Sequence, residues 1–224
     1  MLGAGETIDE VGIAGRPIFI IRGPDGQPTG VRKIARGSDN RPGYFEATRN
    51  EARTYKQIIA ENPEEWRNHV LPYRNSDMNS ASVIIDFDWV DGTDVRTYLA
   101  DHPQDATVVF DHVARQLRWL AEKGYAHGDI DAGNFFRTAD GRILVLDLGL
   151  AHKRIVGAQK EKSDFLHMIR PYIKPKVGSY LNSKPLTMPL ADFFLSASRQ
   201  IRNSTRTTRS QKAGYRGRRT RRSH

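Results

Sequence analysis

Two short motifs hold polar residues that could carry out chemistry on phosphate groups. Residues 127–136 read HGDIDAGNFF, and residues 143–151 read ILVLDLGLA. Asp129 offers a carboxylate that could take a proton from a hydroxyl group, and Asn134 and Asp147 offer oxygen ligands of the kind that Mg²⁺ binds. A carboxylate base and oxygen ligands for a metal-bound nucleotide are what phosphoryl transfer requires.

The neighbouring segments indicate how these residues are positioned. Residues 107–125, TVVFDHVARQLRWLAEKGY, carry apolar side chains at helical spacing and end near Gly124, which predicts a buried helix. FFRT and RILVLDLG, separated by a turn at Asp140-Gly141, predict a short hairpin. We therefore expect Asp129 and Asn134 on a loop between helix and hairpin, and Asp147 just after an apolar strand.

The first ninety residues are rich in strand signals. The runs PIFII and VRKIA, within residues 16–36, flank GPDGQPTG and predict a hairpin. A helix is expected over 45–60, because this segment contains good helix formers and apolar residues at helical spacing. Residues 81–90, ASVIIDFDWV, predict a further strand. Together these elements predict an N-terminal lobe, residues 1–90, of strands and one helix.

Helix signals dominate after this point. Asp94 is a candidate N-cap, and further helices are expected over 162–172 and 190–201. The predicted domains are thus the N-lobe at 1–90, a reduced helical lobe at 91–198, and a tail at 199–224 that has no core-forming pattern and is expected to be disordered. Strands followed by helices predict an α+β protein of two lobes.

Charge and composition narrow the class of protein. The formal net charge is +9, but residues 199–224 contain ten Lys or Arg and no acidic residue, which leaves 25 basic and 26 acidic residues elsewhere. The basic tail suggests nucleic acid, an acidic partner or a nuclear import signal, or only a solubilising end. No cysteine is present, so disulfides and thiolate ligands are excluded. Without an apolar run of membrane-spanning length or a signal peptide, we expect an intracellular protein without membrane contact, cytoplasmic or nuclear.

The pattern H-x-D-x-x-x-x-N followed by D-x-G resembles the catalytic loop and metal motif of the protein-kinase-like superfamily. This resemblance covers roughly residues 8–175. It implies a two-lobed kinase fold that uses ATP and Mg²⁺, with Asp129 as the base and Asn134 and Asp147 as metal ligands. Lys33, in GVRKIA, resembles the strand lysine that reaches the nucleotide phosphates, and Glu51 resembles its helix partner, with Glu46 as the rival partner.

The resemblance also implies an adenine pocket. FDWVDGTDV resembles the hinge between lobes, with Phe87 as gatekeeper and the backbone of Asp88 and Val90 against the base. Val31 and Phe136 would form the roof and floor of this pocket, although ordinary core packing would explain these two residues equally well.

Several positions depart from the superfamily pattern. G-x-G-x-x-G is absent, and only Gly12 and Gly15 stand where a phosphate-binding loop is expected; a plain turn is the alternative. Gly128 replaces the arginine of H-R-D, which makes control through a phosphorylated activation loop unexpected. Asp131 replaces the lysine typical of Ser/Thr kinases, and either orients an amine-bearing substrate or caps the loop. The short C-terminal region is similar in layout to small atypical Ser/Thr kinases such as the KEOPS complex kinase.

The leading hypothesis is therefore a minimal protein serine/threonine kinase that uses Mg-ATP. Its acceptors would be hydroxyl groups on protein, including those of its own tail between Ser204 and Ser210. A kinase of aminoglycoside or choline type is the second hypothesis, favoured by H-G-D and disfavoured by the short C-terminal region. A catalytically silent kinase fold that presents a basic tail to a partner is the third.

Overall fold

The computed structural model describes residues 3–11, 17–39, 41–153, 158–185 and 188–219, the last of these without side chains beyond Ser204. The chain forms two compact units. The first contains Met1–Thr93 and Asn134–His152, and the second contains Asp94–Gly133 and Lys153–His224. One unit is rich in strands and the other is helical, so the predicted α+β protein of two lobes is confirmed.

The first unit is built on a five-stranded antiparallel sheet with the order β1-β2-β3-β5-β4. Its strands are β1 Thr7–Glu10, β2 Ile18–Arg22, β3 Pro28–Arg36, β4 Tyr73–Met78 and β5 Ser82–Asp88. The predicted β2–β3 hairpin is confirmed, and its turn contains Gly26 at a φ of 78°, which glycine adopts without strain. The edge strands β1 and β4 were not predicted, since TIDE and YRNSDM lack alternating apolar residues.

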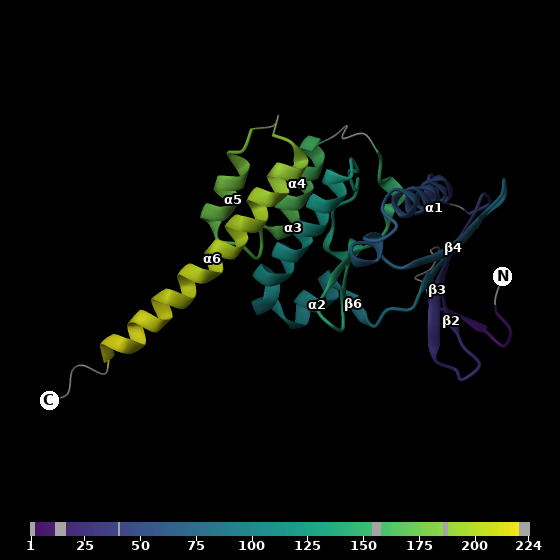
Figure 1. The fold of residues 1–224 in the computed structure, drawn as a ribbon, viewed down its shortest axis with the longest axis horizontal. Helices are drawn as coiled ribbons and strands as arrows, with labels where there is room; N and C mark the ends of the chain where they lie inside the picture. The colour runs from purple at the N-terminus through teal and green to yellow at the C-terminus, as the bar shows by residue number, and fades with distance from the viewer. Residues whose placement is uncertain (1–2, 12–16, 40, 154–157, 186–187, 220–224) are drawn as a thin grey trace. The chain divides into compact units, whose positions relative to one another are not determined.

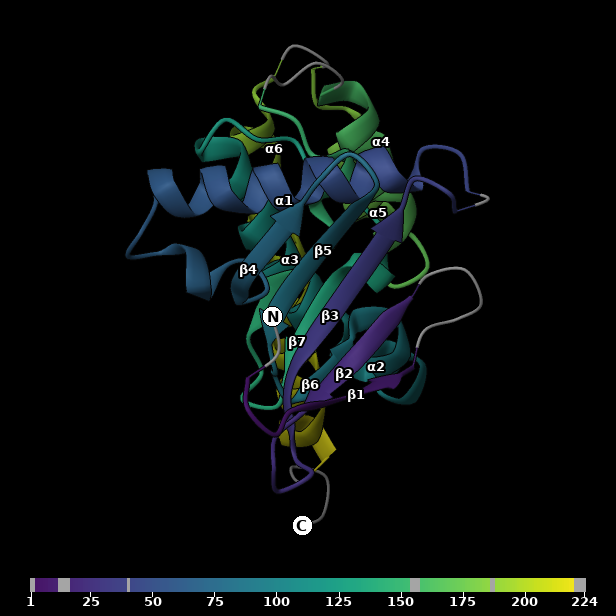
Figure 2. The same cartoon turned by 90° about the vertical axis from the view of Figure 1, so that its right-hand side faces the viewer.

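The predicted helix over 45–60 is confirmed as α1, Tyr44–Glu61, which lies across the strands of the sheet in Figure 2. Its apolar face buries Ala52, Tyr55 and Ile58. The Tyr55 ring stacks on Tyr73 of β4 at 5.7 Å between centroids and meets the edge of Phe87 of β5 at 5.2 Å. These aromatic contacts fix the helix over the strands that carry the predicted site residues.

A second, small sheet has the order β6-β7-β8, and the chain leaves the first unit within β6. Its strands are β6 Gly92–Asp94, β7 Phe135–Thr138 and β8 Ile143–Val145, and the short turn η1 Trp66–Asn68 precedes the segment beside β8. The β7–β8 hairpin is formed as predicted. It belongs to the first unit, although chain order had grouped it with the predicted helical lobe, because backbone hydrogen bonds join Val145 to His69 and Leu71.

The second unit is helical (Figure 1). Its elements are α2 Val95–Asp101, η2 Pro103–Asp105, α3 Ala106–Glu122, α4 Ala158–Ile169, α5 Pro175–Asn182 and α6 Leu190–Arg219. The short turn η3 Ala132–Asn134 begins in this unit, and its last residue, Asn134, belongs to the first unit. The remaining short helix, η4 Leu148–Leu150, belongs to the first unit. Asp94 caps α2 as predicted, since its Oδ1 accepts the Thr97 N–H over 2.9 Å. The predicted apolar face of α3 is fully buried, and α3 packs along α6.

The C-terminal region differs from the predicted disordered tail, because α6 continues to Arg219. The first part of the difference has a tertiary cause: Ser198 and Ile201 are buried, and Ser198 donates a hydrogen bond to Asp111 of α3. Beyond Ile201 the segment contains no proline, and a helix that has already formed adds one hydrogen bond for each further residue. Across the residues that the structure describes, no helix is both long and apolar enough to cross a membrane.

Candidate active site

An ion pair between β3 and α1 forms the centre of the candidate site. Lys33 Nζ lies 2.6 Å from Glu51 Oε2 and 3.5 Å from Asp147 Oδ1. The Lys33 side chain is 14% exposed and that of Glu51 is 3% exposed, whereas 39% of the Asp147 side chain remains exposed. Glu46, the rival partner, instead pairs with Arg49. The pairing that the proposed roles of Lys33 and Glu51 require is therefore present.

The electrostatics of this cluster keep the lysine charged. Burial alone would lower the pKa of Lys33. The carboxylates of Glu51 and Asp147 raise this pKa by more than burial lowers it, so it lies above its ordinary value. Burial raises the pKa of Glu51, and Lys33 opposes that shift. A buried cation held by two carboxylates, one of them half-exposed, is suited to bind the phosphates of a nucleotide.

Asp147 follows β8 in an unusual backbone conformation. Its φ of 48° makes it the one non-glycine residue with positive φ among those described. Such a conformation is held by surrounding contacts and is frequent at functional sites. The contacts come from α1: Asn50 Nδ2 donates to the carbonyl groups of Gly149 and Ala151 at 2.9 Å, and a Cβ on Gly149 would lie only 3.1 Å from the Ala47 carbonyl. Sequence reasoning missed Asn50, which has no recognisable motif.

The adenine-pocket candidates lie at the end of β5. Phe87 is buried, and its Cα partner on β3 is Val31. The Asp88 N–H donates to the Pro72 carbonyl over 2.8 Å, so an adenine base at this position would have to use the Asp88 carbonyl oxygen. Val90 lies two residues beyond Asp88, after Trp89, and Phe136 lies on β7.

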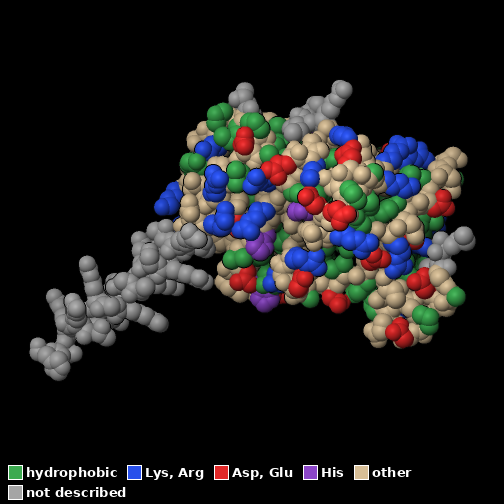
Figure 3. Space-filling model, viewed as in Figure 1, with side chains coloured by type: hydrophobic (Ala, Val, Ile, Leu, Met, Phe, Trp, Pro, Cys, Tyr) green, Lys and Arg blue, Asp and Glu red, His purple; other side chains and the backbone are tan. Residues whose placement is uncertain are grey.

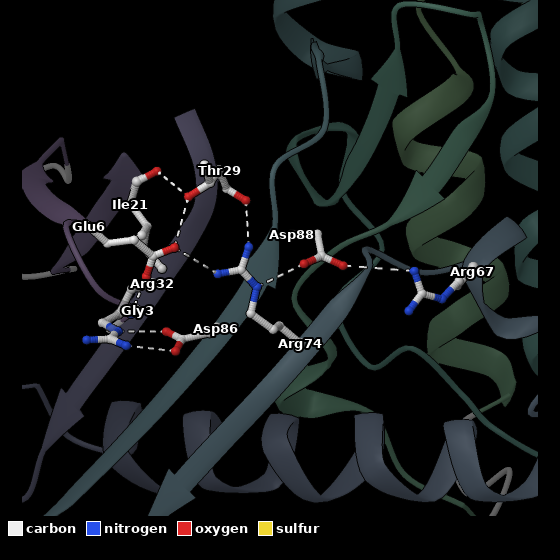
Figure 4. A network of polar contacts seen from close by, with 9 residues as sticks. All are labelled: Gly3, Glu6, Ile21, Thr29, Arg32, Arg67, Arg74, Asp86 and Asp88. Atoms are coloured by element: carbon white, nitrogen blue, oxygen red, sulfur yellow. Dashed lines mark hydrogen bonds and ion pairs between the residues drawn. The ribbon is translucent and has the colours of Figure 1, made fainter. Parts of the chain in front are cut away.

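A network of polar side chains holds the hinge end of the sheet (Figure 4). Arg74 of β4 donates to Asp88 over 2.9 Å and to the Thr29 carbonyl over 2.7 Å. The buried side chains of Arg32 and Asp86 form two parallel bonds of 2.7 and 2.8 Å between β3 and β5. A pair joined by two parallel hydrogen bonds fixes both the distance between the two side chains and their relative orientation. The strands that carry Val31, Lys33 and Phe87 are thereby held together as a rigid support.

Asp129 belongs to the second unit, where the loop that carries it is held by α4. The buried Glu161 carboxylate accepts the N–H groups of His127 and Gly128 at 3.1 and 2.7 Å. Lys160 donates to the Gly128 carbonyl over 3.1 Å. Gly128 has a φ of 85°, which gives a backbone reason for glycine where the superfamily has arginine.

Asp131 is engaged within the same loop. Its Oδ1 accepts the Gly133 N–H over 2.8 Å, and its carboxylate pairs with Arg96 of α2. The capping alternative of the sequence analysis is therefore the one whose contacts are present. Gly12 and Gly15 lie outside the described residues.

Comparisons with known proteins show to which family the chain belongs. Residues 48–178, just over half of the chain, match the family described as ABC1 atypical kinase-like domain. The chain belongs to this family. The predicted membership of the protein-kinase-like superfamily is thus confirmed, whereas the closer resemblance to the KEOPS complex kinase stays a prediction.

Individual relatives resemble the chain at low sequence identity. A curated protein of Arabidopsis thaliana, "Protein ACTIVITY OF BC1 COMPLEX KINASE 3, chloroplastic", is 29% identical over 164 residues, which is 67% of this chain and 22% of that protein. The chain thus spans about a fifth of the length of this relative. A structure of WbdD with the kinase inhibitor LY294002 shares the fold at a TM-score of 0.66 and 14% identity, covering 86% of this chain and 45% of WbdD. The 2.2 Å structure of WbdD shares the fold at a TM-score of 0.67 and 13% identity, covering 88% of this chain and 46% of WbdD.

The ABC1 domain offers two of the oxygen ligands that Mg²⁺ prefers. Asn134 supplies an amide oxygen, and its backbone carbonyl accepts the N–H of Leu146, the residue before Asp147. Asp147 supplies a half-exposed carboxylate. Within the part of the chain that the structure describes, no group of three or more His, Cys, Asp or Glu could hold a metal by itself. The set fits an ion that completes its shell with phosphate oxygens and water, as Mg²⁺ does in nucleotide sites.

Glu161 is the most important residue that sequence reasoning did not assign. It is almost fully buried, and a buried carboxylate needs specific partners. Its partners, the N–H groups of His127 and Gly128, come from a loop more than thirty residues earlier in the chain. The signal available in the sequence was a glutamate in the first turn of an amphipathic helix after DLG, which does not by itself reveal this contact.

Proposed function

We propose that this ABC1 domain is an ATP-dependent phosphotransferase, and that its acceptor is a serine or threonine hydroxyl group of a protein. The observation that carries the proposal is the buried Lys33–Glu51 pair with Asp147 at 3.5 Å from the lysine. Membership of a kinase-like family supports the same chemistry.

The proposed reaction assigns one task to each residue. Lys33, held by Glu51, binds phosphate oxygens of ATP, while Asn134 and Asp147 would hold Mg²⁺, which supplies charge neutralisation on the phosphates. Asp129 accepts the proton of the acceptor hydroxyl group while the oxygen of that hydroxyl group forms a bond to the γ-phosphorus of ATP. The bond from that phosphorus to the bridging oxygen breaks, and ADP leaves with the electron pair. Positioning and electrostatics supply most of the rate.

The acceptor is the least constrained part of the proposal. Asp131 is bound by Gly133 and Arg96, which argues against its use as the anchor of an amine-bearing small molecule and supports a protein acceptor. A small-molecule kinase is the alternative. Screening both classes by ATP consumption, with casein and with choline and aminoglycosides, separates the two.

Replacing Asp129 or Asp147 by asparagine tests the proposed chemistry. Each change keeps side-chain shape but removes the base or the charged metal ligand, so we expect transfer of ³²P from Mg-ATP to fall at least about 100-fold. Asp101→Asn, an exposed aspartate at the end of α2, is the matched control and should label like wild type. Equal labelling by wild type, Asp129→Asn and Asp147→Asn would show that the assignment is wrong.

We also propose that the basic segment after Ser204 contacts nucleic acid, with an intracellular location, cytoplasmic or nuclear. The Arabidopsis relative is named as chloroplastic, so location needs its own experiment. Truncation after Ser204, which keeps the buried Ile201, should abolish binding to a DNA duplex. If the segment contacts six or more phosphates, affinity should fall about 1000-fold between 50 and 200 mM salt, measured by fluorescence anisotropy. Salt-independent binding would contradict this proposal.

A further inference from the structure

A cavity in the second unit plays no part in the proposed reaction. It has a volume of about 530 Å³ and lies between α4, the turn at 170–174 and α5, from Pro175 to Asn182. Leu166 and Ile173 give it apolar walls, while Arg170, Lys174 and Ser179 supply polar groups. This size is within the range of small-molecule sites, which combine apolar walls with a few placed polar groups.

The charges around this cavity have one sign. Arg170 and Lys174 both line it, and no Asp or Glu is among its described lining residues. Within the described part of the chain, the Arg170 guanidinium pairs with no carboxylate, which leaves its donors available for a ligand. Lysine and arginine side chains gather over α5 and the adjoining part of α6 in Figure 3. Two cations beside apolar walls favour a ligand with a doubly charged group on a carbon body.

The wall of the cavity is fixed by contacts on both sides of the turn. The Tyr172 ring packs on Phe110 of α3 at 5.3 Å, and Lys174 Nζ donates to the Ser204 carbonyl over 3.3 Å. The Ile169 carbonyl accepts the Tyr172 N–H, which closes the turn. A preformed wall lowers the ordering cost of binding.

Gly178 gives a second reason to regard the cavity as a binding site. It lies inside the eight-residue helix α5 and lines the cavity. A Cβ there would meet only the Ile173 Cδ1 at 3.8 Å, an ordinary contact, and φ is not positive. Glycine within a helix is less stable than alanine, and neither the backbone conformation nor the packing requires glycine at this position. The absence of a side chain keeps the cavity open.

We propose that this cavity binds a soluble phosphate monoester, with Arg170 and Lys174 on the phosphate group and Leu166 and Ile173 on the organic part. A phosphate monoester carries a charge near −2 at neutral pH, which matches the two cations. This site is separate in sequence and in lining residues from the proposed nucleotide-binding residues, and the inference does not depend on the proposed phosphotransferase activity.

Calorimetric titration of the full chain with phenyl phosphate tests the proposal, with benzyl alcohol as the uncharged comparison. We expect phenyl phosphate to bind saturably and benzyl alcohol not to bind. Arg170→Ser or Lys174→Ser should weaken the binding of phenyl phosphate at least roughly tenfold. Gly178→Leu fills the cavity without changing charge and should abolish binding. Lys176→Ser, on the same helix outside the cavity, and Lys56→Met, an exposed lysine of α1, should bind like wild type.

Several results would overturn the proposal. They are the absence of binding to wild type, an equal loss in Lys176→Ser and Arg170→Ser, full binding by Gly178→Leu, or loss of binding in Lys56→Met. Amide chemical shifts locate the ligand independently of any variant: they should move at His167, Gly178 and Ser179, and movement confined to β3 and α1 would contradict the assignment. Thermal unfolding of each variant verifies that it is folded.

Discussion

Glu161→Gln is expected to lower the turnover number for phosphate transfer about 100-fold while leaving the affinity for ATP nearly unchanged. The Glu161 carboxylate accepts two backbone N–H groups of the loop that carries Asp129, and all the residues proposed to bind the nucleotide lie in the other unit. A glutamine offers one neutral acceptor and places an NH₂ group where the second N–H points. Small displacements of a catalytic group cost rate of this order.

The measurement for Glu161→Gln separates positioning from stability. Initial rates give the turnover number, and the thermal shift induced by Mg-ATP reports nucleotide binding. We expect a stability loss of about 1–3 kcal/mol, since a buried N–H is left poorly satisfied. Asp164→Asn, one turn along α4, removes a carboxylate that pairs with Lys160 and should change the rate little. Loss of ATP binding together with turnover would contradict a role in positioning the loop.

Lys33→Met is expected to destabilise the protein by about 3–5 kcal/mol, because it leaves the Glu51 carboxylate buried without its partner. It should also abolish stabilisation by Mg-ATP. The double variant Lys33→Met with Glu51→Met replaces both charges by apolar groups of similar length and should recover most of the lost stability, but not ATP binding. Lys56→Met, an exposed lysine of α1, is the control and should stay within about 0.5 kcal/mol of wild type.

The stability of Lys33→Met should also depend on pH in a defined direction. Burial already raises the pKa of Glu51, and without Lys33 the opposing influence is lost. A carboxyl whose pKa is higher in the folded than in the unfolded protein binds its proton more tightly when folded. Relative to wild type, Lys33→Met should therefore be most stable at low pH. It should lose stability as the pH rises through the raised pKa of Glu51. Urea unfolding at pH 5 and pH 8 measures this, and equal losses in the single and double variants would contradict it.

Sequence periodicity and motif spacing determined the local elements. The β2–β3 hairpin, α1, the buried face of α3 and the β7–β8 hairpin were all predicted, because each combines a repeated apolar pattern with a turn or cap residue. The same reasoning missed β1 and β4, which are polar edge strands formed by pairing with their neighbours. It also missed α5, whose short segment carries few apolar residues.

Contacts between distant segments were decided only by the tertiary structure. The motif around Lys33 suggested a carboxylate partner, but choosing Glu51 over Glu46 depends on which turn of α1 faces β3. Glu161 reaches a loop more than thirty residues earlier, and Asn50 holds a turn about one hundred residues later. Motifs of short range specify residue types and local conformation, whereas hydrogen bonds over such separations depend on how whole helices and strands pack. The sequence by itself therefore determined which residues could do chemistry, and the fold decided which of them are held by a partner.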